Sequence, residues 1–162
     1  MNLYGPHDTF DPRASRLIPA LIKKCVDARE NGASEIVVWG HGTPTREFLY
    51  LEDATEGIVL VAERYDEPDP VNVGSGFKIS IHDLILLIAE LTGFQGKIRW
   101  DSTQPNGQPR RKLDTTSTEN AFGFRSRVNF LEGLKRTIEW YEHTNRLHSL
   151  PTRTGSRKHR SG

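Results

Sequence analysis

Two turn-rich segments carry the side chains best suited to hold a ligand with rings and phosphates. Residues 39–48 read Trp-Gly-His-Gly-Thr-Pro-Thr-Arg-Glu-Phe, and residues 104–111 read Gln-Pro-Asn-Gly-Gln-Pro-Arg-Arg. A guanidinium group pairs with two phosphate oxygens at once, and an aromatic ring can stack on a base or a sugar. The plainer alternative is a pair of turns with solvated arginines and a core tryptophan, and spacing alone favours that alternative.

Neither glycine pair of the chain, at residues 40–42 or at residues 74–76, completes a dinucleotide-binding loop. Such a loop needs a third glycine three residues after the second, between a strand and a helix that faces the pyrophosphate. Thr45 and Ile79 stand at those positions, and no tyrosine is followed four residues later by lysine. We therefore expect that this chain alone does not hold and use a nicotinamide cofactor.

The six histidines and the single cysteine show no spacing typical of a metal site or a catalytic nucleophile. Cys25 falls on the apolar side of a predicted helix, which indicates a small core residue. A lone cysteine also excludes an internal disulfide and fits a reducing compartment.

The elements that would position these residues are short and alternate between helix and strand. Helical spacing of apolar residues predicts helices at 15–31, 52–65, 81–92, 116–123 and 129–143. Strands are predicted at 35–39, 46–50, 71–73 and 97–100, and residues 1–15 are interpreted as a turn-rich lead-in. This pattern favours a small α/β lobe docked on a larger sheet over a self-contained doubly wound sheet. Residues 1–145 would form the lobe, and residues 146–162 a basic, disordered tail.

The composition suits one domain without a membrane span. The chain has 162 residues, of which 35% are hydrophobic and 27% charged, and its net charge is +1. No apolar run is long enough to cross a bilayer, and the amino-terminal residues do not resemble a signal peptide. We therefore expect a cytoplasmic location. The tail is basic, but without interleaved aromatic residues it gives little reason to expect nucleic-acid binding.

Several motifs form a series along the chain. They are Asn-Leu-Tyr-Gly-Pro-His-Asp at 2–8, Leu-Ile-Pro-Ala-Leu-Ile at 17–22, the segment 38–50, Val-Asn-Val-Gly-Ser-Gly at 71–76, and Pro-Asn-Gly-Gln-Pro-Arg-Arg at 105–111 followed by Leu-Asp at 113–114. In this order they resemble the C-terminal half of the GDP-L-fucose synthase family, which belongs to the extended short-chain dehydrogenase/reductases. The resemblance runs from residue 2 to about residue 143.

The resemblance implies an α/β substrate-binding lobe whose N-terminal Rossmann, cofactor-binding half is missing from this sequence. Members of the family convert GDP-4-keto-6-deoxy-mannose to GDP-L-fucose, by epimerising C-3 and C-5 and reducing the C-4 ketone with NADPH. The N-terminal half supplies the glycine-rich cofactor loop, the Ser/Tyr/Lys triad and a cysteine used in epimerisation. The C-terminal half mainly binds the GDP-sugar.

Carried over by position, the resemblance also implies roles for individual residues. The substrate-binding residues would be Lys24, Trp39, Arg46, Asn106 and Arg111. Those near the cofactor would be Asn2, Leu3 and Arg16.

Arg16 departs from the family pattern, because the family has there the histidine that donates a proton in epimerisation. Arginine stays protonated in proteins and cannot cycle as a general acid near neutral pH. No catalytic residue is therefore expected in this chain, and poor epimerisation is expected even beside an intact N-terminal half.

These implications lead to two hypotheses about the chain. In the first it is the GDP-sugar-binding portion of an NADP(H)-dependent epimerase/reductase, dimeric in the family and inactive as an isolated chain. In the second it is a non-catalytic nucleotide-sugar-binding module, or a subunit that complements a separate Rossmann half. Either way, we expect apolar surface to be exposed on the helix at residues 17–26 and around Trp39.

Overall fold

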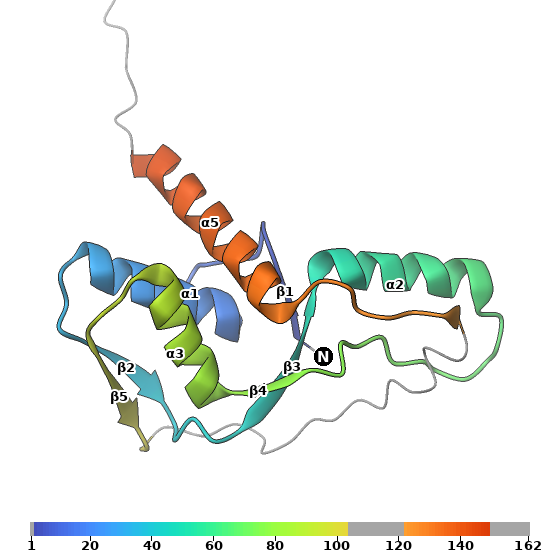
Figure 1. Cartoon of the computed structure of the whole chain (residues 1–162), viewed down its shortest axis with the longest axis horizontal. Coiled ribbons are helices and arrows are strands. Elements are labelled where there is room, and N and C mark those ends of the chain that lie inside the picture. Colours follow the sequence, from blue (N-terminus) through green and yellow to red (C-terminus); the bar gives the residue numbers. More distant parts are fainter. Residues whose placement is uncertain (1, 104–121, 150–162) are drawn as a thin grey trace, which may run out of the picture.

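The computed structural model of the protein describes residues 2–103 and 122–149 and has the expected α/β fold (Figure 1). Its elements, in chain order, are β1 (Asn2–Tyr4), α1 (Leu17–Glu30), β2 (Glu35–Trp39), β3 (Thr45–Tyr50), α2 (Leu51–Arg64), β4 (Lys78–Ser80), α3 (Ile81–Thr92), β5 (Lys97–Asp101) and α5 (Phe130–Ser149). No helix in these two ranges is long and apolar enough to cross a bilayer.

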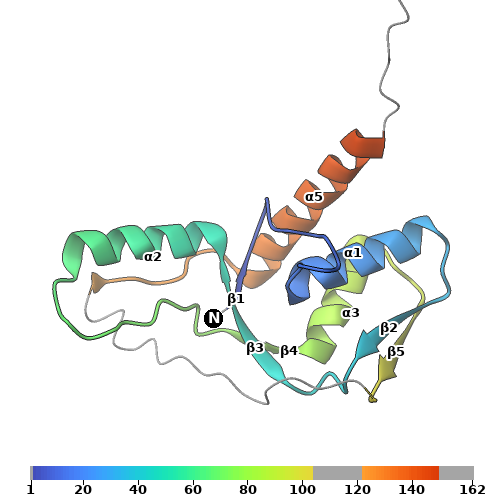
Figure 2. The same cartoon turned by 180° about the vertical axis from the view of Figure 1, so that it is seen from behind.

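The strands form two small sheets. In the first, β3 lies between β1, which runs parallel to it, and β4, which runs antiparallel. In the second, β2 pairs in parallel with β5. Figures 1 and 2 show α1, α3 and the β2–β5 pair on one side of the three-stranded sheet, while α2 extends away from it on the other.

The strand predictions were wrong in three places, one of which is β4, where no strand was predicted. Residues 2–4 were predicted to be part of a loop, but they form β1, because β3 supplies a partner to which Leu3 pairs opposite Leu49. Residues 71–73 form no strand. Val71 and Val73 instead pack, partly buried, against a small core under α2.

The main core lies between α1, α3, α5 and the sheets. Ile18 and Ile22 of α1 are almost fully buried, and α1 packs on α3 and on β2. The expectation that α1 would expose an apolar face was therefore wrong, because α3 and β2 cover that face within the same chain. Around Trp39 the expectation was right, since 66% of its surface is exposed.

A second, smaller core lies beneath α2. It contains Leu49, Ala54, Phe122 and Phe124. The other side of α2 carries exposed apolar residues, which are Leu51, Ile58 and Val59. These three residues recur at helical spacing and form what we call the outer stripe of α2.

Local capping signals set the ends of α3. The Ser80 hydroxyl accepts a hydrogen bond from the backbone N–H of Asp83, at 3.0 Å. At the other end, Gly93 adopts a left-handed conformation with φ of 72°.

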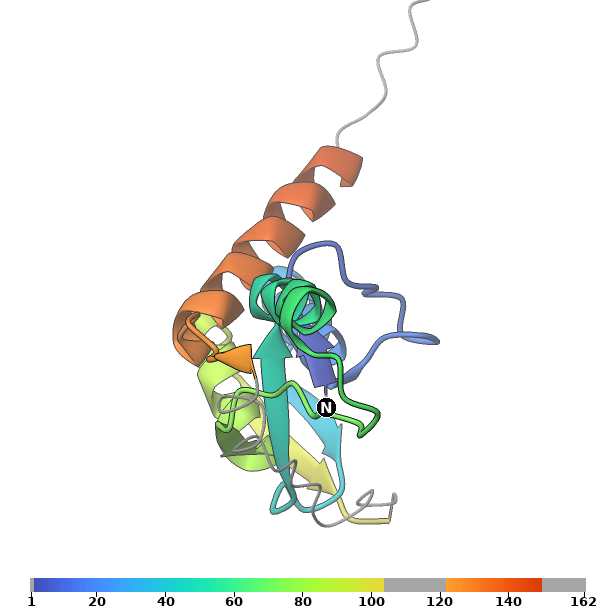
Figure 3. The ribbon, with the colours of Figure 1, turned by 90° about the vertical axis from the view of Figure 1, so that its right-hand side faces the viewer.

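Helix α5 reaches Ser149 and projects beyond the remaining elements (Figure 3). The boundary predicted between residues 145 and 146 falls inside this helix. Residues 150–162 of the predicted tail lie outside the described residues, as does most of the helix predicted at 116–123.

Candidate functional site

Three of the predicted substrate-binding residues, Lys24, Trp39 and Arg46, lie on α1, β2 and β3, and the last two flank the turn that joins β2 to β3. Trp39 is the last residue of β2, and Arg46 is the second residue of β3. Lys24 of α1 is exposed and donates a hydrogen bond to the carbonyl oxygen of Val37, at 2.6 Å. Its ammonium group therefore lies beside β2, near the strand end that carries Trp39. The Arg46 guanidinium is half-buried and donates to the carbonyl of Thr45, at 2.9 Å.

Two of the residues predicted to lie near the cofactor come together in a small pocket at the carboxyl end of β1. This pocket has a volume of about 200 Å³, and Leu3 and Arg16 line it together with Tyr4, Gly5, Pro6, His7, Asp8 and Leu51. His7 has a left-handed φ of 66°, which is uncommon for a residue other than glycine.

The third residue, Asn2, does not line this pocket. Its side-chain amide donates to the backbone carbonyl of Glu47, at 3.2 Å. Asn2 thereby links the start of β1 to the part of β3 that carries Arg46. Asn106 and Arg111 lie outside the described residues.

Glu47 is a buried acid whose position the sequence did not reveal. Only 3% of its surface is exposed, and one carboxylate oxygen accepts from the backbone N–H of Gly76, at 3.1 Å. Its other oxygen is buried and has no hydrogen-bond partner among the described residues. Glu47 thus holds the turn at residues 74–76 against β3, next to Arg46. An acid between an arginine and a phenylalanine inside a predicted strand was the only available signal.

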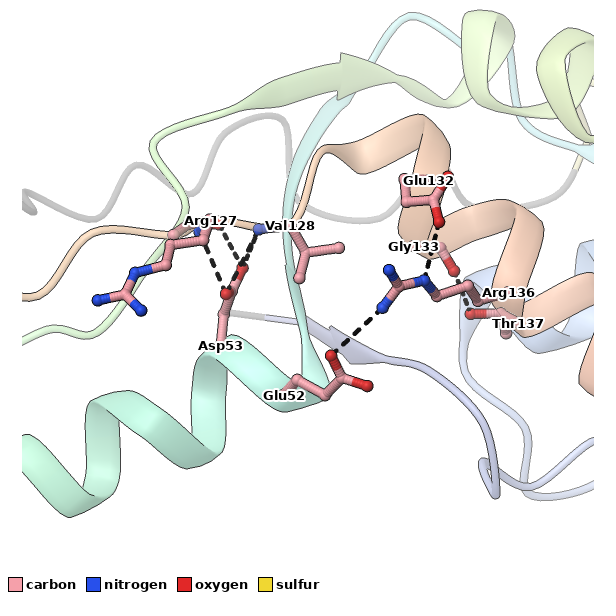
Figure 4. A network of polar contacts seen from close by, with 9 residues as sticks. Glu52, Asp53, Arg127, Val128, Glu132, Gly133, Arg136 and Thr137 are labelled. Atoms are coloured by element: carbon pink, nitrogen blue, oxygen red, sulfur yellow. Dashed lines mark hydrogen bonds and ion pairs between the residues drawn. The ribbon is translucent and has the colours of Figure 1, made fainter.

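Asp53, near the start of α2, is a second buried acid that sequence reasoning missed. Its carboxylate accepts from the Ser126 hydroxyl at 2.6 Å and from the backbone N–H groups of Arg127 and Val128, both at 3.1 Å. Figure 4 shows this cluster between α2 and the segment that leads into α5. Asp53 therefore ties two distant parts of the chain together and plays a structural role.

The two glycine pairs are placed differently from a cofactor loop. The turn at residues 40–42 leads into β3, and the one at 74–76 leads into β4. Neither opens a helix onto a pyrophosphate, as a dinucleotide-binding loop does.

Cys25 is fully buried in the main core, as predicted from its place on the apolar face. Burial raises the pKa of its thiol to about 12, because desolvation disfavours the thiolate. A thiol in this environment is a poor nucleophile. No cluster of three or more His, Cys, Asp or Glu side chains suited to a metal ion occurs within the described ranges.

A larger cleft, of about 520 Å³, lies between the three-stranded sheet and the start of α5. Its lining includes the aromatic residues Tyr4, Phe48, Phe77 and Phe130. Burial raises the pKa of the Tyr4 hydroxyl, which donates to the carbonyl of Phe130. Of the predicted site residues that the structure describes, none lines this cleft.

The fold and the first motifs define a class. Residues 1–74 match the family described as the NAD dependent epimerase/dehydratase family. The fold also superimposes on the crystal structure of a GDP-L-fucose synthetase from Naegleria fowleri bound to NADP, with a TM-score of 0.82 and 28% identity over 90% of this chain. The chain is therefore similar in sequence and in α/β fold to the extended short-chain dehydrogenase/reductases, as predicted.

Within this class the chain resembles the GDP-L-fucose synthases. It is 42% identical over 140 residues to GDP-L-fucose synthase 1 of Arabidopsis thaliana, and 36% identical over 149 residues to GDP-L-fucose synthase of Escherichia coli. Each match takes in 86% of this chain. The chain spans less than half the length of these relatives, 43% and 46%, and 46% of the Naegleria chain.

Proposed function

We propose that this chain forms the GDP-sugar-binding portion of an NADP-dependent 3,5-epimerase/4-reductase that acts on GDP-4-keto-6-deoxy-mannose in GDP-L-fucose biosynthesis. The observation that carries the proposal is the coincidence of two findings. The chain is 42% identical to a GDP-L-fucose synthase. Trp39 and Arg46 flank one turn, and Lys24 contacts β2 two residues before Trp39.

The chemistry of these three side chains suits a nucleotide sugar. A diphosphate needs cations, which Lys24 and Arg46 provide from the two sides of the turn. The exposed indole of Trp39 offers a face for a base or a sugar. In this proposal Asn106 and Arg111 add further polar contacts to the same ligand.

The proposal assigns no turnover to the isolated chain. Reduction requires the hydride donor, the ketone and a proton donor to be held together. Within the described residues, only the small pocket lined by Leu3 and Arg16 borders the place that we assign to the cofactor. Arg16 would contribute a fixed positive charge there and would not donate a proton.

The first prediction concerns Arg46. Calorimetric titration should show that the chain binds GDP in preference to UDP, and Arg46→Ala should weaken GDP binding by about ten- to a hundredfold. This range corresponds to the roughly 1.5–3 kcal/mol of a charge-assisted hydrogen bond. The GDP affinity of Arg46→Lys should lie between those of the wild type and Arg46→Ala, since lysine keeps the charge and loses the forked geometry.

Arg64 supplies the matched control, because it is exposed at the far end of α2. Arg64→Ala removes the same charge and should leave GDP affinity within twofold. Equal affinity for GDP and UDP, or an effect of Arg64→Ala as large as that of Arg46→Ala, would count against the proposed site.

A specific observation also favours the second candidate function, that of a subunit complementing a separate Rossmann half. Among the described residues, β1 has a partner strand on one side only. The outer stripe of α2 begins at Leu51, which also lines the pocket beside Arg16. The open strand edge and the apolar stripe would together offer a docking face for another α/β unit. We therefore assign the docking face to β1 and α2, and not to α1, whose apolar side is covered within the chain.

The second prediction tests this docking face. The chain should co-elute with a separately produced Rossmann half of a GDP-L-fucose synthase. The mixture should oxidise NADPH with the keto sugar, slowly because Arg16 cannot serve as the proton donor in epimerisation. Ile58→Glu should abolish both, because it places a charge in the apolar stripe. Lys135→Glu, which adds a negative charge on an exposed position of α5, should change neither. Co-elution that Ile58→Glu does not weaken would refute this docking face.

A further inference from the structure

The turn at residues 40–44 is anchored to the start of α3. The backbone N–H of Ile81 donates to the carbonyl of Pro44 at 3.0 Å, and that of His82 donates to the carbonyl of Gly42 at 2.9 Å. The first N–H groups of a helix have no partner inside the helix. Here the turn supplies the missing acceptors, so helix and turn hold each other in place.

The same turn is also anchored to β5. The N–H of Gly40 donates to the carbonyl of Asp101 at 2.9 Å. The indole of Trp100 packs against Gly42 so closely that an added Cβ would lie 2.6 Å from Cη2 and 2.8 Å from Cζ2. Gly42 has a φ of 74°, so both its backbone and its surroundings require glycine.

Helix α3 and β5 also meet each other at this point. The rings of His82 and Trp100 are stacked, with centroids 6.0 Å apart and an interplanar angle of 20°. The Cβ of His82 would lie 3.0 Å from a Cβ at Gly42. The turn is thus enclosed by the two aromatic residues and by the helix start.

We propose that Trp100 is a positioning residue for the nucleotide-sugar site, and this inference rests on the proposed function. The turn is the direct connection between Trp39 at the end of β2 and Arg46 at the start of β3. Packing of the Trp100 indole on Gly42 fixes the turn and with it the separation of the two ligand-binding side chains. A site fixed before binding avoids the entropic cost of ordering a loop around the ligand.

A double-mutant cycle on the full chain tests the contact. Gly42→Ala places a methyl group against the indole, and Trp100→Phe removes the fused ring that carries Cη2 and Cζ2. We expect Gly42→Ala to weaken GDP binding at least tenfold and Trp100→Phe about threefold. The double variant should lose at least fivefold less than the product of the two single losses, because phenylalanine leaves room for the methyl group.

Gly32→Ala is the matched control for Gly42→Ala. Gly32 has a similar left-handed φ of 63°, but a Cβ there would meet nothing within 4 Å. The variant therefore carries the same kind of backbone strain without the steric contact. It should leave GDP affinity within twofold.

Amide hydrogen exchange of the same four proteins measures, without a ligand, how firmly the turn is held against α3. In Gly42→Ala the amides of Ile81 and His82 should exchange at least tenfold faster, while the amide of Ile88 in the middle of α3 keeps its protection. The double variant should recover most of the lost protection. Unchanged protection in Gly42→Ala, or losses that simply add, would overturn the inference.

The two readouts separate this inference from the proposed function. If the wild-type chain does not bind GDP, the proposed function fails, and amide exchange still decides whether Trp100 holds the turn. If exchange is coupled but the losses of GDP affinity simply add, Trp100 holds the turn without positioning the ligand, and the inference is overturned.

Discussion

Replacing Asp53 with alanine should lower the free energy of unfolding by about 3 kcal/mol, because hydrogen bonds to a charged group contribute about 1.5–3 kcal/mol and buried donors left unpaired add to the loss. The carboxylate accepts from the Ser126 hydroxyl and from the N–H groups of Arg127 and Val128. Urea unfolding followed by circular dichroism would measure the change.

The effect should extend beyond the local hydrogen bonds. Two residues before the segment that Asp53 holds lies Phe124, which belongs to the small core beneath α2. Asp53 also lies in the first turn of α2, where a negative charge interacts favourably with the helix dipole and stabilises the helix. Asp53→Asn keeps the shape of the side chain and one acceptor oxygen. Its free energy of unfolding should therefore lie between that of the wild type and that of Asp53→Ala.

Glu52 is the matched control because it is the neighbouring acid. It is exposed and forms a solvent-exposed ion pair with Arg136, at 3.4 Å (Figure 4). Exposed ion pairs contribute little, so Glu52→Ala should cost less than about 0.5 kcal/mol. Equal losses for the two alanine variants would show that the Asp53 cluster does not stabilise the fold.

The parts of the fold that the sequence predicted well are those with local causes. Ser80 and Gly93 mark the two ends of α3, and the helix begins and ends there, because capping depends on residues within one turn. The apolar spacing in α1 likewise predicted the helix and the burial of Cys25. The binding roles of Trp39 and Arg46, which come from a motif around a single turn, stay predictions.

The parts that the sequence predicted poorly depend on distant partners. Residues 71–73 alternate like a strand, but no strand lies beside them and Val71 and Val73 pack into a core instead. Strand β1 exists because β3 lies next to it. Glu47 gave no local sign of its contact with Gly76, which lies 29 positions further along the chain.

The error about α1 leads to the last prediction, because it decides which helix belongs to the core and which is open to a partner. Ile22 of α1 is fully buried, whereas 66% of the surface of Ile58 on α2 is exposed. Removing buried methyl groups loses transfer free energy and leaves a cavity. Ile22→Ala should therefore lower the free energy of unfolding of the chain by about 3 kcal/mol, within the range for buried isoleucine.

The same substitution at Ile58 should cost less than about 0.5 kcal/mol in the chain by itself, because surface changes without a special contact are nearly neutral. Urea unfolding of both variants would measure the difference, with the wild type as reference. If α1 were the face left open for a partner, Ile22→Ala would be harmless and the order of the two losses would be reversed. The predicted order instead means that α1 stabilises the chain from within, while Ile58 and its neighbours on the outer stripe of α2 remain available to another α/β unit.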